Sequence, residues 1–404
     1  MSFIKVYKQF VITAFNRKLL FLDGDSCWSY EIKPDLPLEK CRPRKYFDAD
    51  SDSDEDDDDA KQKSSENQPE QQQSNGNQAE KVQIVALEVH ETKSLLAVAT
   101  SDKSLYLFEI DTNGAGGNLK FLSRRLVSRA SSCMCFAASG GFLIVCDKGG
   151  DCYRYDCDDC KKPGRWLLGH MSQVLDVAVT DDEKLIITCD RDEKIRVTNH
   201  PECHTIETFC LGHGEFVSQL TFLMKGEKSY LLSLSGDKTL RFWDYMNGKE
   251  LAKTELDQPG NRIVTKSVND GSVIAAILCY EPTKIAIMKL NAENLKCDSI
   301  QTLNLKQDEV FSSFAFDEKF NLLTLVIAKS TEKVSLRVYQ FDKENCKFSE
   351  QSSSSMIDAF TSNTESDCLP YVDSVSFLFK KKFDNIKDYQ ERKRRRMEVG
   401  CKLK

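Results

Sequence analysis

A histidine, a serine and an aspartate stand at a spacing that resembles a hydrolytic triad. His213, Ser233 and Asp237 occur in this order, and Trp243 follows them. In such a triad histidine takes the proton of the serine hydroxyl while aspartate orients the imidazole, which makes the serine oxygen a nucleophile. The chemistry also needs an oxyanion hole and a substrate cleft, and no segment resembles the strained turn that carries the nucleophile of many hydrolases.

A second set of similar residues favours a structural role instead. His170, Thr188 and Asp192 precede the first set by 43 to 45 residues. A nucleophile has no reason to recur once per repeat, whereas a hydrogen-bond chain that ties a repeated unit together does. We therefore predict no catalytic residue in either set. The residues expected to make such structural hydrogen bonds are His170, Thr188, His213, Ser233, Asp237 and Trp243.

Cysteine and histidine spacing gives one weak indication of a metal. Cys157 and Cys160 have the gap of zinc ligands, but no second cysteine pair or histidine pair accompanies them. His200 and His204 flank Cys203 and lack further ligands in the same way. The alternative at Cys157 and Cys160 is a solvent loop after a strand, so we predict no metal site. The sequence also has no Gly-rich phosphate loop and no readable S-adenosylmethionine pocket, so we predict no cofactor.

The composition is that of an intracellular globular protein. Of 404 residues, 40% are hydrophobic and 29% are charged, which allows a large core. No run reaches the roughly 18 apolar residues of a membrane span, and the N-terminal residues lack the apolar block of a signal peptide. We expect the sixteen cysteines to be free thiols, because reducing compartments disfavour disulfides.

The formal net charge of -7 hides two segments of opposite charge. Residues 48–59 hold nine acidic side chains, and residues 380–404 hold eleven basic against four acidic ones. Acidic runs of this kind act as solvating tails or engage basic partners. A basic run binds phosphate groups with salt-sensitive affinity, and it also serves as a nuclear-import signal. The average charge therefore describes neither segment.

A repeat of about 45 residues organises the rest of the chain. Strands that follow a polar turn begin at Leu105, Cys152, Ile195, Leu240, Ile285 and Leu336, at steps of 47, 43, 45, 45 and 51 residues. A further copy at Ser26–Ile32 matches Ser104–Ile110 once residues 42–80 are set aside. Short strands at this period are typical of propellers. The predicted fold class is all-β, a seven-bladed WD-repeat β-propeller with a disordered acidic insertion and a basic helical C-terminal tail.

The repeats also set the expected boundaries. Residues 1–41 form the first propeller blade, and residues 42–80, rich in acidic and amide side chains, form a disordered acidic linker. Residues 81–379 supply the remaining blades and a closing strand, from near Tyr371 to Phe379, that pairs with the first blade. Residues 380–404 form a basic tail, in which Phe383, Ile386 and Tyr389 are spaced for the apolar face of a short helix.

Two charged segments are the candidate binding sites. The segment Arg191–Arg196 packs five charges of both signs into a turn and the strand after it. It is either a solvated rim with self-paired charges or a docking patch whose alternating signs fix the register of a partner. The candidate partner-binding residues are Asp192, Glu193, Lys194 and Arg196. The candidate RNA-binding residues are Lys380, Lys381, Lys382, Arg392, Lys393, Arg394, Arg395 and Arg396.

Two consecutive repeats carry a more specific signature. Its residues are Leu168–His170 (LGH), Leu175–Val179 (LDVAV), Asp190–Val197 (DRDEKIRV), Ile206–His213 (IETFCLGH) and Glu215–Ser218 (EFVS). This block of about 50 residues resembles the WD-repeat, non-catalytic subunit of tRNA (guanine-N7)-methyltransferase, the Wuho family. The tail, with Phe383–Ile386 followed by basic residues, is similar to that family as well.

The resemblance implies a function. In that family the propeller is not an enzyme, and it binds a separate S-adenosylmethionine-dependent methyltransferase that methylates N7 of a guanine in the variable loop of tRNA. The resemblance therefore implies a scaffold that forms a heterodimer with the catalytic subunit, stabilises it and helps to hold tRNA, with S-adenosylmethionine bound by that partner. It implies the nucleus as the main location, the cytoplasm as a second one, and no membrane. Without it, the same features fit a WD-repeat scaffold in chromatin or ribosome assembly.

Overall fold

The computed structural model describes residues 2–39, 43, 82–111, 117–225, 228–268, 272–291, 293–380, 389–390 and 392–394. The chain divides into two compact units, residues 1–372 and 373–404. Apart from residue 43, the predicted acidic linker lies outside the described residues. In the described ranges, no helix is long and apolar enough to cross a membrane.

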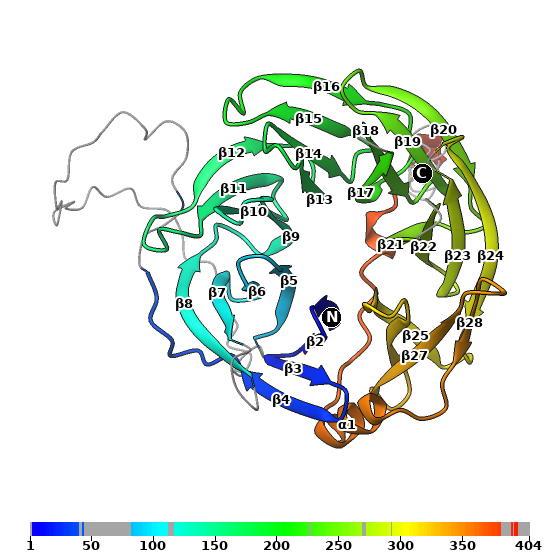
Figure 1. Ribbon diagram of the computed structural model, residues 1–404. Helices are drawn as coiled ribbons and strands as arrows, with labels where there is room; N and C mark the ends of the chain where they lie inside the picture. Colours follow the sequence, from blue (N-terminus) through cyan, green and yellow to red (C-terminus); the bar gives the residue numbers. More distant parts are fainter. Residues whose placement is uncertain are drawn as a thin grey trace, which may run out of the picture. The chain divides into compact units, whose positions relative to one another are not determined.

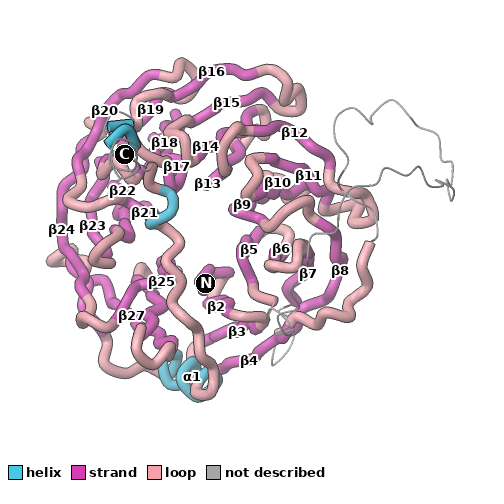
Figure 2. Tube along the Cα trace, turned by 180° about the vertical axis from the view of Figure 1, so that it is seen from behind, coloured by secondary structure: helices cyan, strands magenta, loops and turns pink. Residues whose placement is uncertain are grey.

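The first unit is a ring of seven sheets around a central axis (Figure 1). Each sheet consists of four antiparallel strands that follow one another directly in the sequence, and the view from behind shows the same radial arrangement (Figure 2). The predicted seven-bladed β-propeller is therefore confirmed. We number the sheets as blades one to seven, in the order of the sequence.

The strands of the blades have the following bounds. Blade one contains β1 (Ser2–Tyr7), β2 (Phe10–Phe15), β3 (Lys18–Asp23) and β4 (Ser26–Glu31), and blade two contains β5 (Ile84–His90), β6 (Leu95–Thr100), β7 (Ser104–Asp111) and β8 (Asn118–Leu126). Blade three contains β9 (Ser131–Phe136), β10 (Phe142–Asp147), β11 (Asp151–Asp156) and β12 (Arg165–Gly169), and blade four contains β13 (Val174–Val179), β14 (Leu185–Asp190), β15 (Ile195–Asn199) and β16 (Ile206–Cys210). Blade five contains β17 (Val217–Lys225), β18 (Lys228–Ser235), β19 (Thr239–Asp244) and β20 (Lys249–Glu255). Blade six contains β21 (Gly260–Ser267), β22 (Ser272–Cys279), β23 (Lys284–Asn291) and β24 (Lys296–Asn304), and blade seven contains β25 (Glu309–Phe316), β26 (Leu322–Ala328), β27 (Val334–Asp342) and β28 (Lys347–Glu350).

The place of a strand in its blade decides its burial. The second strands β2, β6, β10 and β14 are buried at every residue, because neighbouring blades pack on both of their faces. The outermost strands β16 and β20 are mostly exposed. This explains why the second strands are continuous apolar runs in the sequence while the outermost strands are mixed.

Blade seven meets blade one through packing between complete sheets. The Ser2 and Ser312 hydroxyl oxygens lie 2.6 Å apart, and the backbone N–H of Ile4 donates to Ser313 Oγ at 3.2 Å. Behind them, buried side chains of β1–β3 and β25–β27 form one hydrophobic cluster. The ring is therefore closed here by side chains from two blades that are furthest apart in the sequence.

A C-terminal segment covers this joint, and we call residues 354–369 the clasp. It contains the helix α1 (Ser355–Thr364), whose first turn is capped by the Ser354 hydroxyl, and Phe360 of α1 is fully buried in the cluster of the two blades. Lys18 of blade one pairs with Asp367 at 3.0 Å, and Leu369 N–H donates to a backbone carbonyl of blade seven. The clasp therefore binds both blades at once.

The predicted closing strand from Tyr371 to Phe379 is wrong. Blade one already has four strands of its own, so it does not need a late strand to complete it. Residues 371–375 are not part of any strand, and the 3-10 helix η2 (Ser376–Leu378) follows them. The Asp373 side chain accepts the backbone N–H groups of Val375 and Ser376, which favours a turn over an extended strand.

The antiparallel order gives the ring two different faces. Turns between the second and third strands lie on the same face as the loops that connect one blade to the next, and we call this the connector face. Turns between the first and second strands, and between the third and fourth, lie on the opposite face. The connector face therefore carries the turn 191–194 and the loop 170–173, while the opposite face carries residues 180–184 and 157–164.

Candidate functional site

The predicted hydrogen-bond chain of blade five lies on the connector face. His213 Nε2 and Ser233 Oγ are 2.7 Å apart, Trp243 Nε1–H donates to Ser233 Oγ at 2.7 Å, and His213 Nδ1 lies 2.9 Å from Asp237 Oδ2. Burial alone would raise the pKa of Asp237, but the hydrogen bond and charge of His213, with the Thr239 hydroxyl, hold it well below its ordinary value. The buried chain joins the loop before the blade to its second and third strands.

Blade four has the same chain with one change. His170 Nε2 lies 2.7 Å from Thr188 Oγ1, as expected, but His170 Nδ1 lies 2.9 Å from Asp190 Oδ2. The expectation that Asp192 would play this part is wrong. Asp190 is buried at the start of the turn, and its other carboxylate oxygen accepts the backbone N–H groups of Asp192 and Lys194. One carboxylate thus orders both the turn and the histidine, which leaves the Asp192 side chain outside the chain.

The cysteines considered as zinc ligands lie in the loop after β11. Burial raises the pKa of the Cys157 thiol to about 12, and Cys160 Sγ donates to the Cys157 carbonyl. Across the described ranges, no group of three or more potential ligand side chains is arranged to hold a metal ion.

The four candidate partner-binding residues differ in exposure. In the turn between β14 and β15, Lys194 is exposed, while Asp192 and Glu193 are partly buried. Glu193 has a φ of 71°, the left-handed conformation that reverses the chain in this turn. Arg196 is partly buried in β15, where burial lowers its pKa, and its Nη1 donates to the Gly169 carbonyl of blade three at 3.1 Å. Arg196 therefore also links two neighbouring blades.

Sequence reasoning missed two apolar side chains beside this turn. Met171 follows His170 in the loop that enters blade four, and the residue is 99% exposed. Leu211 is 63% exposed, and the pairing of Ile195 with Cys210 places it next to Lys194 across the β15–β16 hairpin. The signal would have been a large apolar residue in a connecting loop beside each of the two Gly-His pairs, Gly169-His170 and Gly212-His213. The turn is thus charged in the middle and apolar on both sides.

The candidate RNA-binding residues belong to the second unit. Lys380, Arg392, Lys393 and Arg394 are exposed, and Arg392–Arg394 are helical. Lys381, Lys382, Arg395 and Arg396 lie outside the described residues, as do Phe383 and Ile386 of the expected apolar helix face. The described cations of this unit are therefore accessible to an anionic partner.

Comparisons with known proteins agree with these observations. The sequence matches the family described as tRNA methyltransferase TRM82 WD40 domain over residues 26–162 and 158–360. It is 67% identical over 410 residues to the Aedes aegypti protein named tRNA (guanine-N(7)-)-methyltransferase non-catalytic subunit wuho, covering 100% of this chain and 98% of the relative. The Culex quinquefasciatus protein of the same name is 58% identical, with 99% of both chains covered, and the Drosophila melanogaster protein is 38% identical, with 75% and 72% covered.

One solved structure extends the comparison at the level of the fold. A chain in the crystal structure of the mitotic checkpoint complex matches with a TM-score of 0.57 at 12% sequence identity, covering 79% of this chain and 84% of the other. At this identity the match supports the propeller fold alone.

Proposed function

This chain belongs to the family of WD-repeat, non-catalytic subunits of tRNA (guanine-N7)-methyltransferase, and from that premise we propose that it forms a heterodimer with the catalytic subunit through the connector face of blade four. The chain is not itself the enzyme of this reaction. The catalytic subunit binds S-adenosylmethionine and transfers the methyl group to N7 of guanine, and the propeller stabilises that subunit and helps to hold the tRNA.

The proposed docking site rests on the pattern of apolar and charged side chains around the turn 191–194. We call Met171, Asp192, Glu193, Lys194 and Leu211 the docking surface. Two exposed apolar side chains on either side of a charged turn supply both parts of a specific interface, since apolar anchors contribute affinity and charges fix orientation. The alternating signs of Asp192, Glu193 and Lys194 select one register of a partner with complementary charges.

The basic residues of the second unit support contact with the tRNA backbone. Lysine and arginine side chains displace counterions from phosphates, so each contact adds affinity that falls as salt rises. Exposed Arg392, Lys393 and Arg394 fit this role, and the same run fits recognition for import into the nucleus, where we place the complex.

The docking surface is tested by co-expressing the chain with its catalytic subunit and measuring co-purification. Lys194→Glu reverses the one exposed charge of the turn and should weaken the complex about tenfold or more, because a like charge then faces the partner. Lys103→Glu is the matched control: Lys103 is exposed in the corresponding turn of blade two, with a left-handed φ of 63°. Equal yields from both variants would contradict the proposed surface.

The cellular function is tested by nucleoside mass spectrometry of tRNA from cells depleted of the chain. Loss of N7-methylguanosine, restored by the wild-type chain and not by Lys194→Glu, is the expected result. A scaffold in chromatin or ribosome assembly would instead leave tRNA methylation unchanged and bring histones or pre-ribosomal particles through the purification.

A further inference from the structure

A pocket opens on the face opposite the docking surface, between blades three and four. It has a volume of about 500 Å³ and lies between the loops at residues 139–142 and 156–162 and the turns at residues 183 and 200–201. This volume is typical of sites that hold a small molecule or a few side chains. The opening therefore has the size of a binding site, and the docking surface leaves it uncovered.

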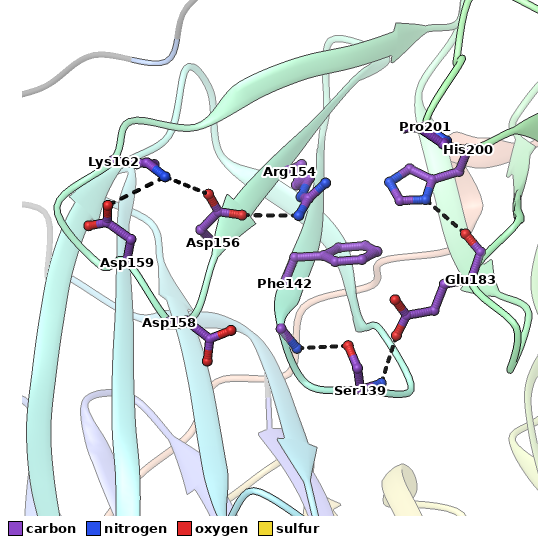
Figure 3. A pocket seen from close by; sticks show the side chains of 11 residues that line it. Ser139, Phe142, Arg154, Asp156, Asp158, Asp159, Lys162, Glu183, His200 and Pro201 are labelled. Atoms are coloured by element: carbon purple, nitrogen blue, oxygen red, sulfur yellow. Dashed lines mark hydrogen bonds and ion pairs between the residues drawn. The ribbon is translucent and has the colours of Figure 1, made fainter.

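His200 presents a hydrogen-bond acceptor to this pocket. His200 Nδ1 donates to the Glu183 backbone carbonyl at 2.8 Å, since a carbonyl oxygen only accepts. In a neutral imidazole that bond fixes the tautomer and leaves Nε2 as an acceptor. His200 Nε2 is buried and has no hydrogen-bond partner within the described residues, and it lies on the side of the ring that faces Phe142 and Arg154 (Figure 3). A buried acceptor in this position is satisfied by a ligand that carries N–H groups.

Carboxylates dominate the charge of the pocket. Asp156, Asp158, Asp159 and Glu183 oppose Arg154 and Lys162, so four negative and two positive lining charges leave a net charge of -2. Both cations are already engaged, because Arg154 pairs with Asp156 at 3.2 Å and Lys162 with Asp159 at 3.5 Å. Asp158 pairs with Lys93 of blade two, yet 76% of its side chain remains exposed. Glu183 Oε1 accepts the backbone N–H of Ser139 at 2.7 Å, which leaves its other carboxylate oxygen for a ligand. The pocket thus attracts a cation and repels phosphate.

A flat apolar wall completes the site. Phe142 is buried, with the Arg154 guanidinium carbon 4.3 Å from its ring centroid and the His200 ring centroid 5.0 Å away. Asp158 and Glu183 lie on opposite sides of Phe142 (Figure 3). The Arg154 guanidinium and the His200 ring already lie against the Phe142 ring, so a ligand cation is held by the carboxylates, to whose oxygens its N–H groups donate.

We infer that this pocket binds an arginine or lysine side chain of an extended basic peptide in a partner protein. The cation lies between Asp158 and Glu183 and donates to His200 Nε2. RNA does not fit, because its phosphates would face four carboxylates. The site lies on the other face from the docking surface, so the propeller can hold a peptide-bearing protein and the catalytic subunit at the same time. The two surfaces can therefore be tested independently, and evidence against one does not count against the other.

Binding is measured by fluorescence anisotropy with the full chain and the labelled peptide Gly-Ser-Arg-Lys-Ser-Gly. The double variant Asp158→Asn with Glu183→Gln keeps the size of both side chains and removes two negative charges, so affinity should fall about tenfold. The matched control is Glu318→Gln with Glu344→Gln, which removes two exposed charges from the corresponding turns of blade seven on the same face. That control should bind the peptide as the wild type does.

A second measurement reports on the acceptor itself. In chain labelled with nitrogen-15 at its five histidines, the Nε2 signal of His200 should shift when peptide is added and stay still in the pocket double variant. No binding to the wild type, equal weakening in both double variants, or an unmoved Nε2 signal would overturn the inference. Binding of a polyuridine RNA that is lost in the pocket variant would also overturn it, because an anion would then be the ligand.

Discussion

Replacing Phe360 by alanine should destabilise the whole propeller by loosening its joint. Phe360 of the clasp is fully buried, and its ring lies 6.4 Å from that of Phe15 in blade one, inclined by 68°. Replacing a buried phenylalanine by alanine lowers the free energy of unfolding by about 3 to 5 kcal/mol. Loss of an edge-to-face ring pair lowers it by about 0.5 to 1.5 kcal/mol. Because folded proteins have net stabilities of about 5 to 15 kcal/mol, the free energy of unfolding should fall by a large fraction.

Urea unfolding followed by tryptophan fluorescence measures this effect. Trp28 of blade one, one of three tryptophans in the chain, stacks on Phe21 with ring centroids 3.8 Å apart, so part of the emission reports on the blade next to the joint. The control is Ser362→Ala on the exposed side of the same helix, which should change the free energy of unfolding by less than about 0.5 kcal/mol. If Phe360→Ala cost no more than this control, the clasp would not hold the ring closed and our account of the joint would be wrong.

Three further predictions concern polar groups of the first unit. Burial raises the pKa of Asp176 to about 6, so between about pH 4 and pH 6 the folded chain binds a proton that the unfolded chain has released. The free energy of unfolding should therefore rise as the pH falls from about 6 to about 4. Asp176→Asn should flatten this dependence, as measured by unfolding at a series of pH values. Ser233→Ala leaves the Trp243 N–H unpaired in the core and should cost about 1 to 3 kcal/mol in thermal unfolding, whereas Ser233→Thr, which keeps the hydroxyl, should cost less. Lys18→Met breaks the pair with Asp367 and should lower stability by up to about 1 kcal/mol at low salt, with the difference from wild type shrinking in high salt.

The blades were predictable because their signal is local. Each blade consists of four consecutive strands, so a repeat in the sequence maps directly onto a sheet in space. The six repeat strands beginning at Leu105 to Leu336 lie in β7, β11, β15, β19, β23 and β27, the third strands of blades two to seven. Ser26–Ile32, in contrast, contains the fourth strand of blade one. Its pattern resembles the third strand of blade two, so this copy was aligned with the wrong strand of the blade.

The joint and the turn of blade four were not predictable in the same way. The clasp acts through contacts between residues more than 300 positions apart, such as Asn16 with Cys368, and no periodic pattern encodes such a pair. In the turn, the sequence offers both Asp190 and Asp192 as partners for His170. Which of them comes within hydrogen-bond distance depends on the path of the backbone, and the structure shows that it is Asp190. The exposure of Met171 and Leu211 likewise depends on how far their loops extend beyond the blade.

The distance in sequence between the two sides of the joint has a consequence for synthesis. Blade one leaves the ribosome first, but the side chains that cover its open side belong to β25–β27 and the clasp. At about 5 to 20 residues per second, Phe15 waits roughly 20 to 70 seconds for Phe360. During that time the apolar side of blade one is exposed on a nascent chain that cannot yet close its ring, which makes it a natural place for a chaperone to act.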